Sequence, residues 1–298
     1  MRTLRIPRGN FNAVCYTADG AHLVGLHSGG RLRVWATADF AERFVAPLPV
    51  KVPLLETCRL VGDLAVTSRG VYSLGRVWAA LSAGPGTVRD RTLIDEVHLE
   101  GRPQWSTLVL SPDGTTIYAV EANYRRGADD LLRWDLTGQA MARLGLPAMG
   151  HHFAVSPDGV TVALLYGMEV FLVGPGESAV LASLPHSDAV QRALFSPDGA
   201  RLAVGAGRSL WVWDLATRRG ERLRAFDKYV SALAFRPDGS LMAADNAGEI
   251  RHIDPASGRQ LACLNFEVGA IHDLAFSPDG MTVAGAGHDN AVVVWDLE

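Results

Sequence analysis

A four-residue phrase that recurs at nearly constant spacing is the feature that most constrains how this chain can fold. Successive copies are 45, 40, 40 and 41 residues apart: Ser111-Pro112-Asp113-Gly114, Ser156-Pro157-Asp158-Gly159, Ser196-Pro197-Asp198-Gly199, Arg236-Pro237-Asp238-Gly239 and Ser277-Pro278-Asp279-Gly280. A weaker copy, Thr17-Ala18-Asp19-Gly20, precedes them. A period in the low forties indicates one supersecondary unit that is repeated, each copy burying its face against the next.

The phrase itself is typical of hairpin turns. Short apolar runs stand on both sides of it, such as residues 193–195 and 201–204 around the third copy. Proline presets φ for the first central turn position, aspartate bonds its own backbone, and glycine accepts a positive φ. Turn chemistry explains all four positions together, so we favour it over the alternative in which the aspartates line a metal or acid–base site.

A second marker, Trp-Asp or its remnant, follows the phrase in each unit. Its positions are Trp35, Trp78, Trp134, Val173, Trp213, Ile253 and Trp295, and the Trp-Asp pair is intact at 134, 213 and 295. In this reading, Trp78 supplies the marker of a unit that lacks the first phrase. The markers therefore predict seven units.

These residues resemble the WD-repeat (tryptophan–aspartate repeat) family over essentially the whole chain. The resemblance implies an all-β fold, a seven-bladed β-propeller with four-stranded antiparallel blades, and one domain over residues 1–298. In that family a polar tetrad links a His, a Ser or Thr, an Asp and the Trp. Here one unit has His186 and Trp213 without the Asp, and another has Asp289 and Trp295 without the His. We therefore expect blades to pack mainly through apolar contacts.

The last unit ends at its third strand, so its fourth strand must come from elsewhere. The segment 3–16 aligns at constant offset with 222–235, whose first residues form the outer strand of a blade. We therefore expect the N-terminal strand, about residues 3–6, to pair beside 291–296 and close the ring, as the family does. Such closure hides a sheet edge that would otherwise invite aggregation. It also predicts that the chain is a complete domain.

Composition excludes several classes of protein. With 48% hydrophobic and 20% charged residues, the 298-residue chain has the composition of a well-buried core. Its net charge is −4 and no block of like charges occurs, which argues against nucleic-acid and membrane partners. The scarcity of Lys beside Arg is typical of a GC-rich bacterial genome.

The compartment predicted from the sequence is the cytoplasm. There is no apolar stretch long enough to span a bilayer and no signal pattern at the N-terminus. Cys15, Cys58 and Cys263 are isolated and odd in number, which favours buried thiols in a reducing compartment over a disulfide frame or a zinc site.

Two insertions interrupt the regular spacing. The first, 81–90, is expected between the third and fourth strands of the second blade, and the other, 123–130, between the second and third strands of the third blade. The resemblance implies that second-to-third loops lie on the usual partner-binding face. A loop with Tyr and paired Arg has the composition of an interface anchor. The alternative is a neutral loop whose arginines pair with Asp129 and Asp130.

We predict that the partner-binding residues lie on this face, in that loop and at the start of each first strand. These are Arg102, Trp105, Tyr124, Arg125, Arg126, His151, His152, Arg192, Tyr229 and His272. Trp105 stands where sister units have an aliphatic residue, which favours the core for it. Adjacent His151 and His152 point to opposite faces of a strand, so we expect no metal site there.

Sequence motifs of catalysis are absent: there is no Gly-x-Ser-x-Gly elbow, His-Glu-x-x-His helix or phosphate-binding loop. We therefore expect no catalytic residues, no metal and no cofactor. The predicted function is a non-catalytic scaffold that binds a partner protein or peptide, which rests partly on analogy of fold. The alternative is a propeller hydrolase of the lactonase type, whose blade motif residues 111–123 also resemble.

Overall fold

The structure is a computed structural model of the whole chain. It describes residues 1–5, 9–27, 30–48, 58–61, 63–67, 70–84, 86–100, 107–121, 129–146, 152–174, 180–265, 269–287 and 289–297. Among the residues predicted to bind a partner, Arg102, Trp105, Tyr124, Arg125, Arg126 and His151 lie outside the described residues.

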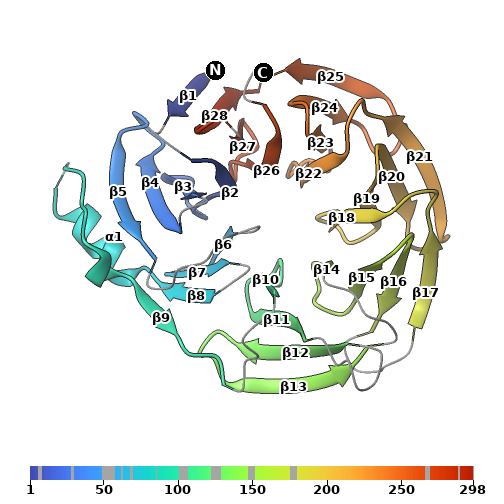
Figure 1. Cartoon of the computed structure of the whole chain (residues 1–298), viewed down its shortest axis with the longest axis horizontal. Coiled ribbons are helices and arrows are strands. Elements are labelled where there is room, and N and C mark those ends of the chain that lie inside the picture. Colours follow the sequence, from blue (N-terminus) through green and yellow to red (C-terminus); the bar gives the residue numbers. More distant parts are fainter. Residues whose placement is uncertain are drawn as a thin grey trace. The chain divides into compact units, whose positions relative to one another are not determined.

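The described residues form seven four-stranded antiparallel sheets (Figure 1). These are the blades of a seven-bladed β-propeller, so the predicted fold class is confirmed. The chain divides into two compact units: unit 1 is Met1–His98 with Phe266–Glu298, and unit 2 is Leu99–Asn265. One domain over 1–298 stays a prediction.

Unit 1 contains three blades. The strands of the first are β2 (Phe11–Tyr16), β3 (His22–His27), β4 (Arg31–Ala36) and β5 (Glu42–Pro47). Those of the second are β6 (Cys58–Val61), β7 (Leu64–Thr67), β8 (Gly70–Ser73) and β9 (Asp95–Val97), with helix α1 (Gly75–Ser82) and a 3-10 turn (Arg91–Leu93) between β8 and β9. The third consists of β26 (Ile271–Phe276), β27 (Thr282–Gly287), β28 (Ala291–Asp296) and β1 (Arg2–Arg5).

Unit 2 contains four blades, each built from four consecutive strands. The first two blades consist of β10 (Thr107–Leu110), β11 (Thr116–Glu121), β12 (Asp130–Asp135) and β13 (Ala140–Gly145), and of β14 (His152–Val155), β15 (Val162–Tyr166), β16 (Glu169–Val173) and β17 (Val180–Pro185). The third consists of β18 (Val190–Phe195), β19 (Arg201–Ala206), β20 (Ser209–Asp214) and β21 (Arg219–Ala225). The fourth consists of β22 (Val230–Phe235), β23 (Leu241–Asp245), β24 (Glu249–Ile253) and β25 (Gln260–Asn265). In each sheet of unit 2 the first and the fourth strand are the two edges.

The recurrent phrase forms the turn between the first two strands of a blade, as predicted. In the third copy the Ser196 hydroxyl donates to Asp198 at 2.5 Å and accepts from the Arg201 amide at 2.9 Å. Gly199 has φ +68°, a conformation that side chains rarely adopt. The serine hydrogen bond lowers the pKa of Asp198, so its carboxylate is committed to the turn.

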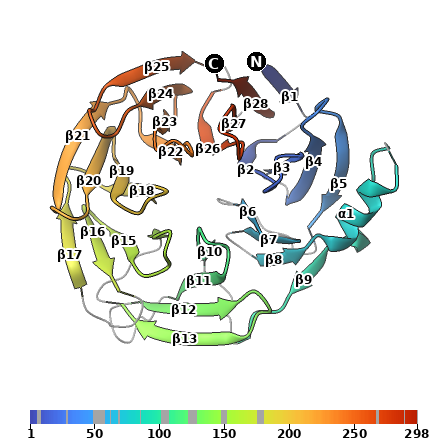
Figure 2. The ribbon, with the colours of Figure 1, turned by 180° about the vertical axis from the view of Figure 1, so that it is seen from behind.

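The N-terminal strand completes the blade of the C-terminal strands. β1 pairs antiparallel with β28, and Arg2 lies opposite Val294 while Arg5 lies opposite Ala291. Figures 1 and 2 show β1 beside β28 from both sides. The predicted N-terminal completion is confirmed, and the strand spans residues 2–5 where 3–6 was expected.

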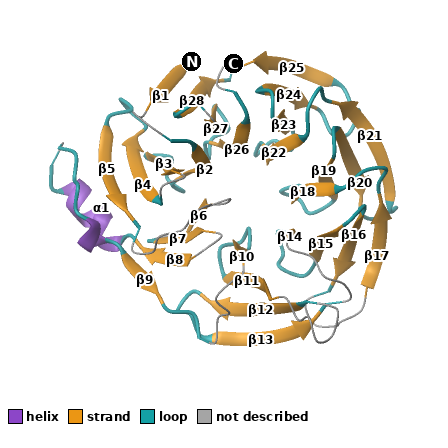
Figure 3. Cartoon of the chain, in the orientation of Figure 1, coloured by secondary structure: helices purple, strands orange, loops and turns teal. Residues whose placement is uncertain are grey.

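One predicted marker is wrong. Trp78 was expected to end a third strand, but it lies in α1, and the third strand of that blade is β8 (Figure 3). The Arg-Val-Trp-Ala sequence that resembles residues 33–36 forms a helix here, with Val77 buried and the Arg76 side chain exposed. The prediction of seven blades is still correct, because β6–β9 form the second blade although Trp78 does not lie on its third strand.

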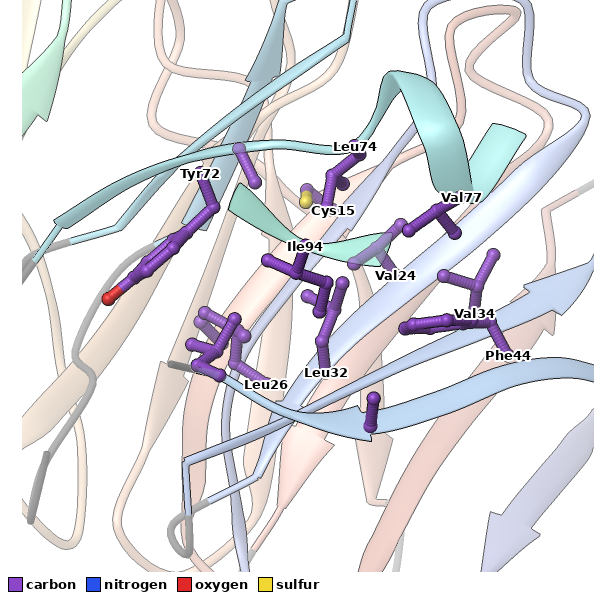
Figure 4. Packing of buried hydrophobic residues seen from close by; sticks show 14 residues of the cluster. Cys15, Val24, Leu26, Leu32, Val34, Phe44, Tyr72, Leu74, Val77 and Ile94 are labelled. Carbon is purple, nitrogen blue, oxygen red and sulfur yellow. The ribbon is translucent and has the colours of Figure 1, made fainter. Parts of the chain in front are cut away.

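The first insertion covers the outer edge of β5. Val45 donates its amide to the Val88 carbonyl at 3.0 Å, and Val88 donates its own amide to Arg43 at 2.8 Å. Val77 of α1 and Ile94 join Phe44 in one buried apolar cluster (Figure 4). The insertion lies between the third and fourth strands of its blade, as predicted, and it fills a sheet edge of the same chain.

None of the helical segments in the described part of the chain has the length and apolar character that a bilayer crossing needs.

Candidate partner-binding surface

One end of the blades in unit 2 presents a continuous set of turns, which we call the turn edge. It consists of second-to-third-strand turns and of the residues that precede first strands: 166–168, 186–189, 207–208, 226–229 and 246–248. These are the positions at which the sequence predicted a partner-binding face.

Backbone hydrogen bonds join neighbouring blades along the turn edge. The amide of Val190, the first residue of β18, donates to Gly167 of the preceding blade at 2.9 Å. The amide of Val230, the first residue of β22, donates to Gly207 in the same way at 3.0 Å. Gly207 has φ +54°, and a Cβ there would lie 1.8 Å from the Asp188 carboxylate, so only glycine fits. The turns are thus fixed by the fold.

A buried histidine supports the turn edge from below. Trp213 Nε1 donates to His186 Nε2 at 3.0 Å, so the ring of His186 is a neutral acceptor at that nitrogen. Burial lowers the pKa of His186 to about 4, partly opposed by the backbone carbonyls of Leu184 and Met168. The incomplete tetrad predicted for this unit therefore still makes its His–Trp contact. In another blade Trp134 Nε1 donates to the Glu100 carbonyl at 2.7 Å.

Arg192 lies on β18 beside a β-bulge and reaches the next blade. The register shifts between Val190 and Arg192, and Arg192 Nε donates to the Ser231 carbonyl on β22 at 3.0 Å. In unit 1 the equivalent bulge on β26 precedes Asp273, which accepts from the Val14 amide on β2 at 3.0 Å. Bulges re-aim side chains. Here they turn one residue of the first strand toward the neighbouring blade.

Three large side chains are exposed on the turn edge. Tyr166 is 51% exposed, Met168 50% and Tyr229 52%. Tyr and Met are enriched where proteins meet, because they supply large contact areas that adapt to a partner. Tyr166 and Met168 were not predicted. The signal that could have found them is a pair of large apolar residues on either side of a turn glycine.

The four described residues of the predicted set have different environments. Tyr229 is exposed on the turn edge, whereas Arg192 is half-buried and hydrogen-bonded across blades. His152 is half-buried at the start of β14. In unit 1, His272 is half-buried at the bulge of β26. Their role in partner binding stays a prediction.

The second insertion lies between β11 and β12, as predicted, and residues 122–128 of it are outside the described residues. Asp130, at its end, faces Arg143 of β13, whose Nη1 lies 3.5 Å from the Asp130 carboxylate. Arg143 also pairs with Glu121. The carboxylate of Asp130 is thus paired with the guanidinium of Arg143 from its own sheet. Pairing of Arg125 and Arg126 with the aspartates stays an open alternative.

A cavity of about 380 Å³ lies in unit 1 at the opposite ends of the strands, beside the hairpin turns 17–20 and 277–280. The Tyr16 hydroxyl lies 3.0 Å from the Thr282 hydroxyl, and burial raises the pKa of Tyr16 to about 12. Arg2 lies over the ring of Phe40 at 4.9 Å. Within the described residues, no three His, Cys, Asp or Glu side chains are placed to hold a metal ion.

Comparison with known proteins agrees with the fold. The family model described as "WD domain, G-beta repeat" matches residues 179–214 and 258–296. Small ribosomal subunit protein RACK1y of Oryza sativa subsp. japonica is 35% identical over 119 residues, which cover 38% of this chain and 34% of that protein. WD repeat-containing protein slp1 of Schizosaccharomyces pombe is 29% identical over 140 residues, covering 46% of this chain and 28% of that protein.

Transducin beta-like protein 3 of Bos taurus is 31% identical over 155 residues, covering 49% of this chain and 19% of that protein. The chain thus spans at most 34% of the length of these three relatives. The blades and the repeat matches define a repeat protein of the β-propeller class. The chain is similar to WD-repeat proteins in the matched segments and in its fold.

Proposed function

We propose that this chain is a non-catalytic protein-interaction scaffold that binds a partner protein or peptide on the turn edge of unit 2. The observation that carries the proposal is the exposure of Tyr166, Met168 and Tyr229 on turns whose backbones are tied blade to blade. Large side chains on a fixed backbone bind with little loss of conformational freedom. The matches to WD-repeat proteins support the same class of function.

The charged residues of the turn edge are arranged like the polar rim of a protein interface around these side chains. Asp188, Arg208, Asp227 and Lys228 are all exposed there. A mixture of both signs favours specific pairing with a complementary surface over general attraction to a polyanion. We therefore propose a protein or peptide as partner, and neither nucleic acid nor membrane.

The cytoplasm is part of the same proposal. Neither Cys15 nor Cys263 is in a disulfide; Cys15 is buried, as predicted, whereas Cys263 is exposed, so the predicted burial is wrong for Cys263. Free thiols are typical of compartments that keep cysteines reduced.

The test is affinity capture from the native host with matched triple variants. We expect the variant Tyr166→Ala, Met168→Ala and Tyr229→Ala to lose the protein that the wild-type chain captures, with an unchanged melting temperature. The control replaces three exposed apolar residues elsewhere in unit 2, Val160, Val180 and Leu261. Equal capture by both triple variants would remove the turn edge as the binding surface.

A separate variant addresses the second insertion. Alanine at Tyr124, Arg125 and Arg126, combined with Tyr229→Ala, should weaken capture further if the loop contributes contacts. If capture by this quadruple variant equals capture by Tyr229→Ala alone, the loop is not part of the interface.

A further inference from the structure

The outer edge of β21 has the features of a second, independent docking surface. β21 is the terminal strand of its sheet, and among the described residues no hydrogen bond covers the outer side of Arg219–Arg222. Residues 216–222 are all exposed. A bare strand edge offers backbone donors and acceptors to another extended chain.

This edge carries positive charge without internal partners. Arg218, Arg219 and Arg222 are exposed, and none of them makes an ion pair or side-chain hydrogen bond within the described residues. The nearby acidic side chains are Glu221, which lies toward Gly258 of the next blade, and Asp214, which lies opposite Arg219 on β20. Three guanidinium groups thus face solvent beside two carboxylates.

Some arginines on other blades form ion pairs within their own sheets. Arg33 pairs with Glu42 and Arg251 with Glu249, each within its own sheet. Arg143, on an outer strand like β21, pairs with two carboxylates. The unpaired arginines of β21 therefore differ from these three, while Arg31 of β4 is likewise exposed without an ion pair in the described residues.

Arg218 also occupies a backbone position that suits glycine. Its φ is +56°, and the same position in sister turns is Phe40 at φ +57° and Gly258 at φ +66°. A side chain in this conformation costs folding stability, and such strain is concentrated at functional sites. Phe40 adopts the same conformation in the first blade, where its ring packs under Arg2, so the conformation by itself does not point to a ligand.

The chain itself shows what fits the outer edge of a blade. On β5, the extended segment around Val88 pairs with Arg43 and Val45 through backbone bonds of 2.8 and 3.0 Å. Thr87 adds a bond from its hydroxyl to the Glu42 carbonyl at 2.6 Å. The outer edge of β5 is thus occupied by an extended segment of the same chain.

We propose that the outer edge of β21 binds an extended acidic peptide by strand addition. The peptide backbone would pair with residues 219–222. Arg219 and Arg222 point to opposite faces of the strand, so the alternate carboxylates of the peptide would accept hydrogen bonds from one of them, and Arg218 adds a guanidinium at the end of the edge. Backbone pairing supplies affinity, and the arginines select Asp or Glu over neutral residues.

The proposal is tested by fluorescence anisotropy with the full chain and a labelled ten-residue peptide of alternating Thr and Glu. The double variant Arg219→Glu and Arg222→Glu should weaken binding roughly tenfold or more, since charge-assisted bonds become repulsive contacts. The matched control is Arg31→Glu, an exposed arginine of β4 without an ion pair in the described residues, which should bind like the wild type. Equal affinities of double variant and control would overturn the proposal.

Two further probes separate strand addition from simple attraction. A peptide of equal charge in which Pro replaces the central Thr cannot form the ladder and should bind several-fold more weakly. Single-stranded oligothymidine should bind more weakly than the acidic peptide at the same salt. If either probe binds as tightly as the strand-forming peptide, the site is a general anion site and the proposal fails.

Folding and the proposed function of the turn edge are controlled separately. Arg218→Gly should lose affinity for the acidic peptide without loss of thermal stability. The triple alanine variant of Tyr166, Met168 and Tyr229 should bind the acidic peptide normally. A loss of affinity in that triple variant would show that the peptide binds the turn edge, which would overturn the assignment to β21.

Discussion

Two outer strands of the same repeat, β5 and β21, meet their surroundings in opposite ways. β5 is covered by the insertion between β8 and β9, and Phe44, Val45 and Ala46 are buried. Among the described residues nothing covers β21 in this way, and its residues 219–222 are exposed and include two arginines. The same secondary structure is therefore core in one blade and surface in another.

The difference shows where an insertion contributes to folding and where a blade is left free to bind. The insertion at 81–90 interrupts the regular spacing of the repeat, and its described residues pack against their own unit. Loops on rigid scaffolds often carry function. In this chain, the regular blade β18–β21 presents the free surface, and the irregular blade uses its extra residues for packing.

The largest expected contrast is in stability. Phe44→Ala should reduce the free energy of unfolding by about 3–5 kcal/mol, because it removes a fully buried ring and leaves a cavity. Its counterpart Arg222→Ala on β21 should change it by no more than about 0.5 kcal/mol. Urea titrations followed by fluorescence measure both. Similar losses in the two variants would contradict the distinction between a covered and a bare edge.

The next effect concerns the cover of β5 itself. Val88→Pro removes the amide that bonds the Arg43 carbonyl, and we expect a loss of about 1–3 kcal/mol in unfolding free energy. Val88→Ala keeps the amide and should cost less, since Val88 is only half-buried. Equal costs for both substitutions would mean that the backbone bond to β5 contributes little.

The pH dependence of stability tests the interior of the blade β18–β21, whose outer edge is exposed. The pKa of His186 is about 4 when folded against 6.5 as its ordinary value, so the unfolded chain binds a proton that the folded chain excludes between those values. The stability contributed by neutral His186 is present above pH 6.5 and is lost as pH falls toward 4. Melting temperatures should fall over this window more steeply for the wild type than for His186→Gln. Parallel curves would show that His186 does not titrate in this way.

The smallest effect has the opposite sign. Arg218→Gly should stabilise the chain by about 1 kcal/mol, because glycine adopts φ +56° without strain. Arg219→Gly, one residue further along in β21, should not stabilise it, since a strand position gains nothing from glycine. Differential scanning fluorimetry is sensitive enough for the comparison. A destabilised Arg218→Gly variant would remove the argument from strain.

The fold could be predicted from sequence because turn chemistry is local. Serine, aspartate and glycine at fixed offsets form the same hairpin turn in each copy. The residues Ser196, Asp198 and Gly199 therefore predict a hairpin turn from sequence alone. The N-terminal strand was predictable because its pattern matches an outer strand elsewhere in the chain. Trp78 was misread because a Trp on a strand and a Trp on a helix can have the same neighbours in sequence, and tertiary packing decides between them.

The candidate surfaces were less predictable. Tyr229 stood out by its position before a first strand, but Tyr166 and Met168 lie in a turn of ordinary length. The arginines of β21 are conspicuous only once their lack of partners is known, and sequence does not show which charges pair. Edge exposure is likewise a property of the assembled sheets, as the contrast between β5 and β21 demonstrates.

Hydrogen exchange with and without the acidic peptide tests the contrast between the two edges most directly. In the free chain, the Val45 amide, which bonds Val88, should exchange slowly, whereas amides within 219–222 that point outward should exchange fast. Addition of the peptide of alternating Thr and Glu should slow exchange in β21 and leave β5 unchanged. Unchanged exchange in β21 at saturating peptide, or slowing in β5 instead, would contradict the account.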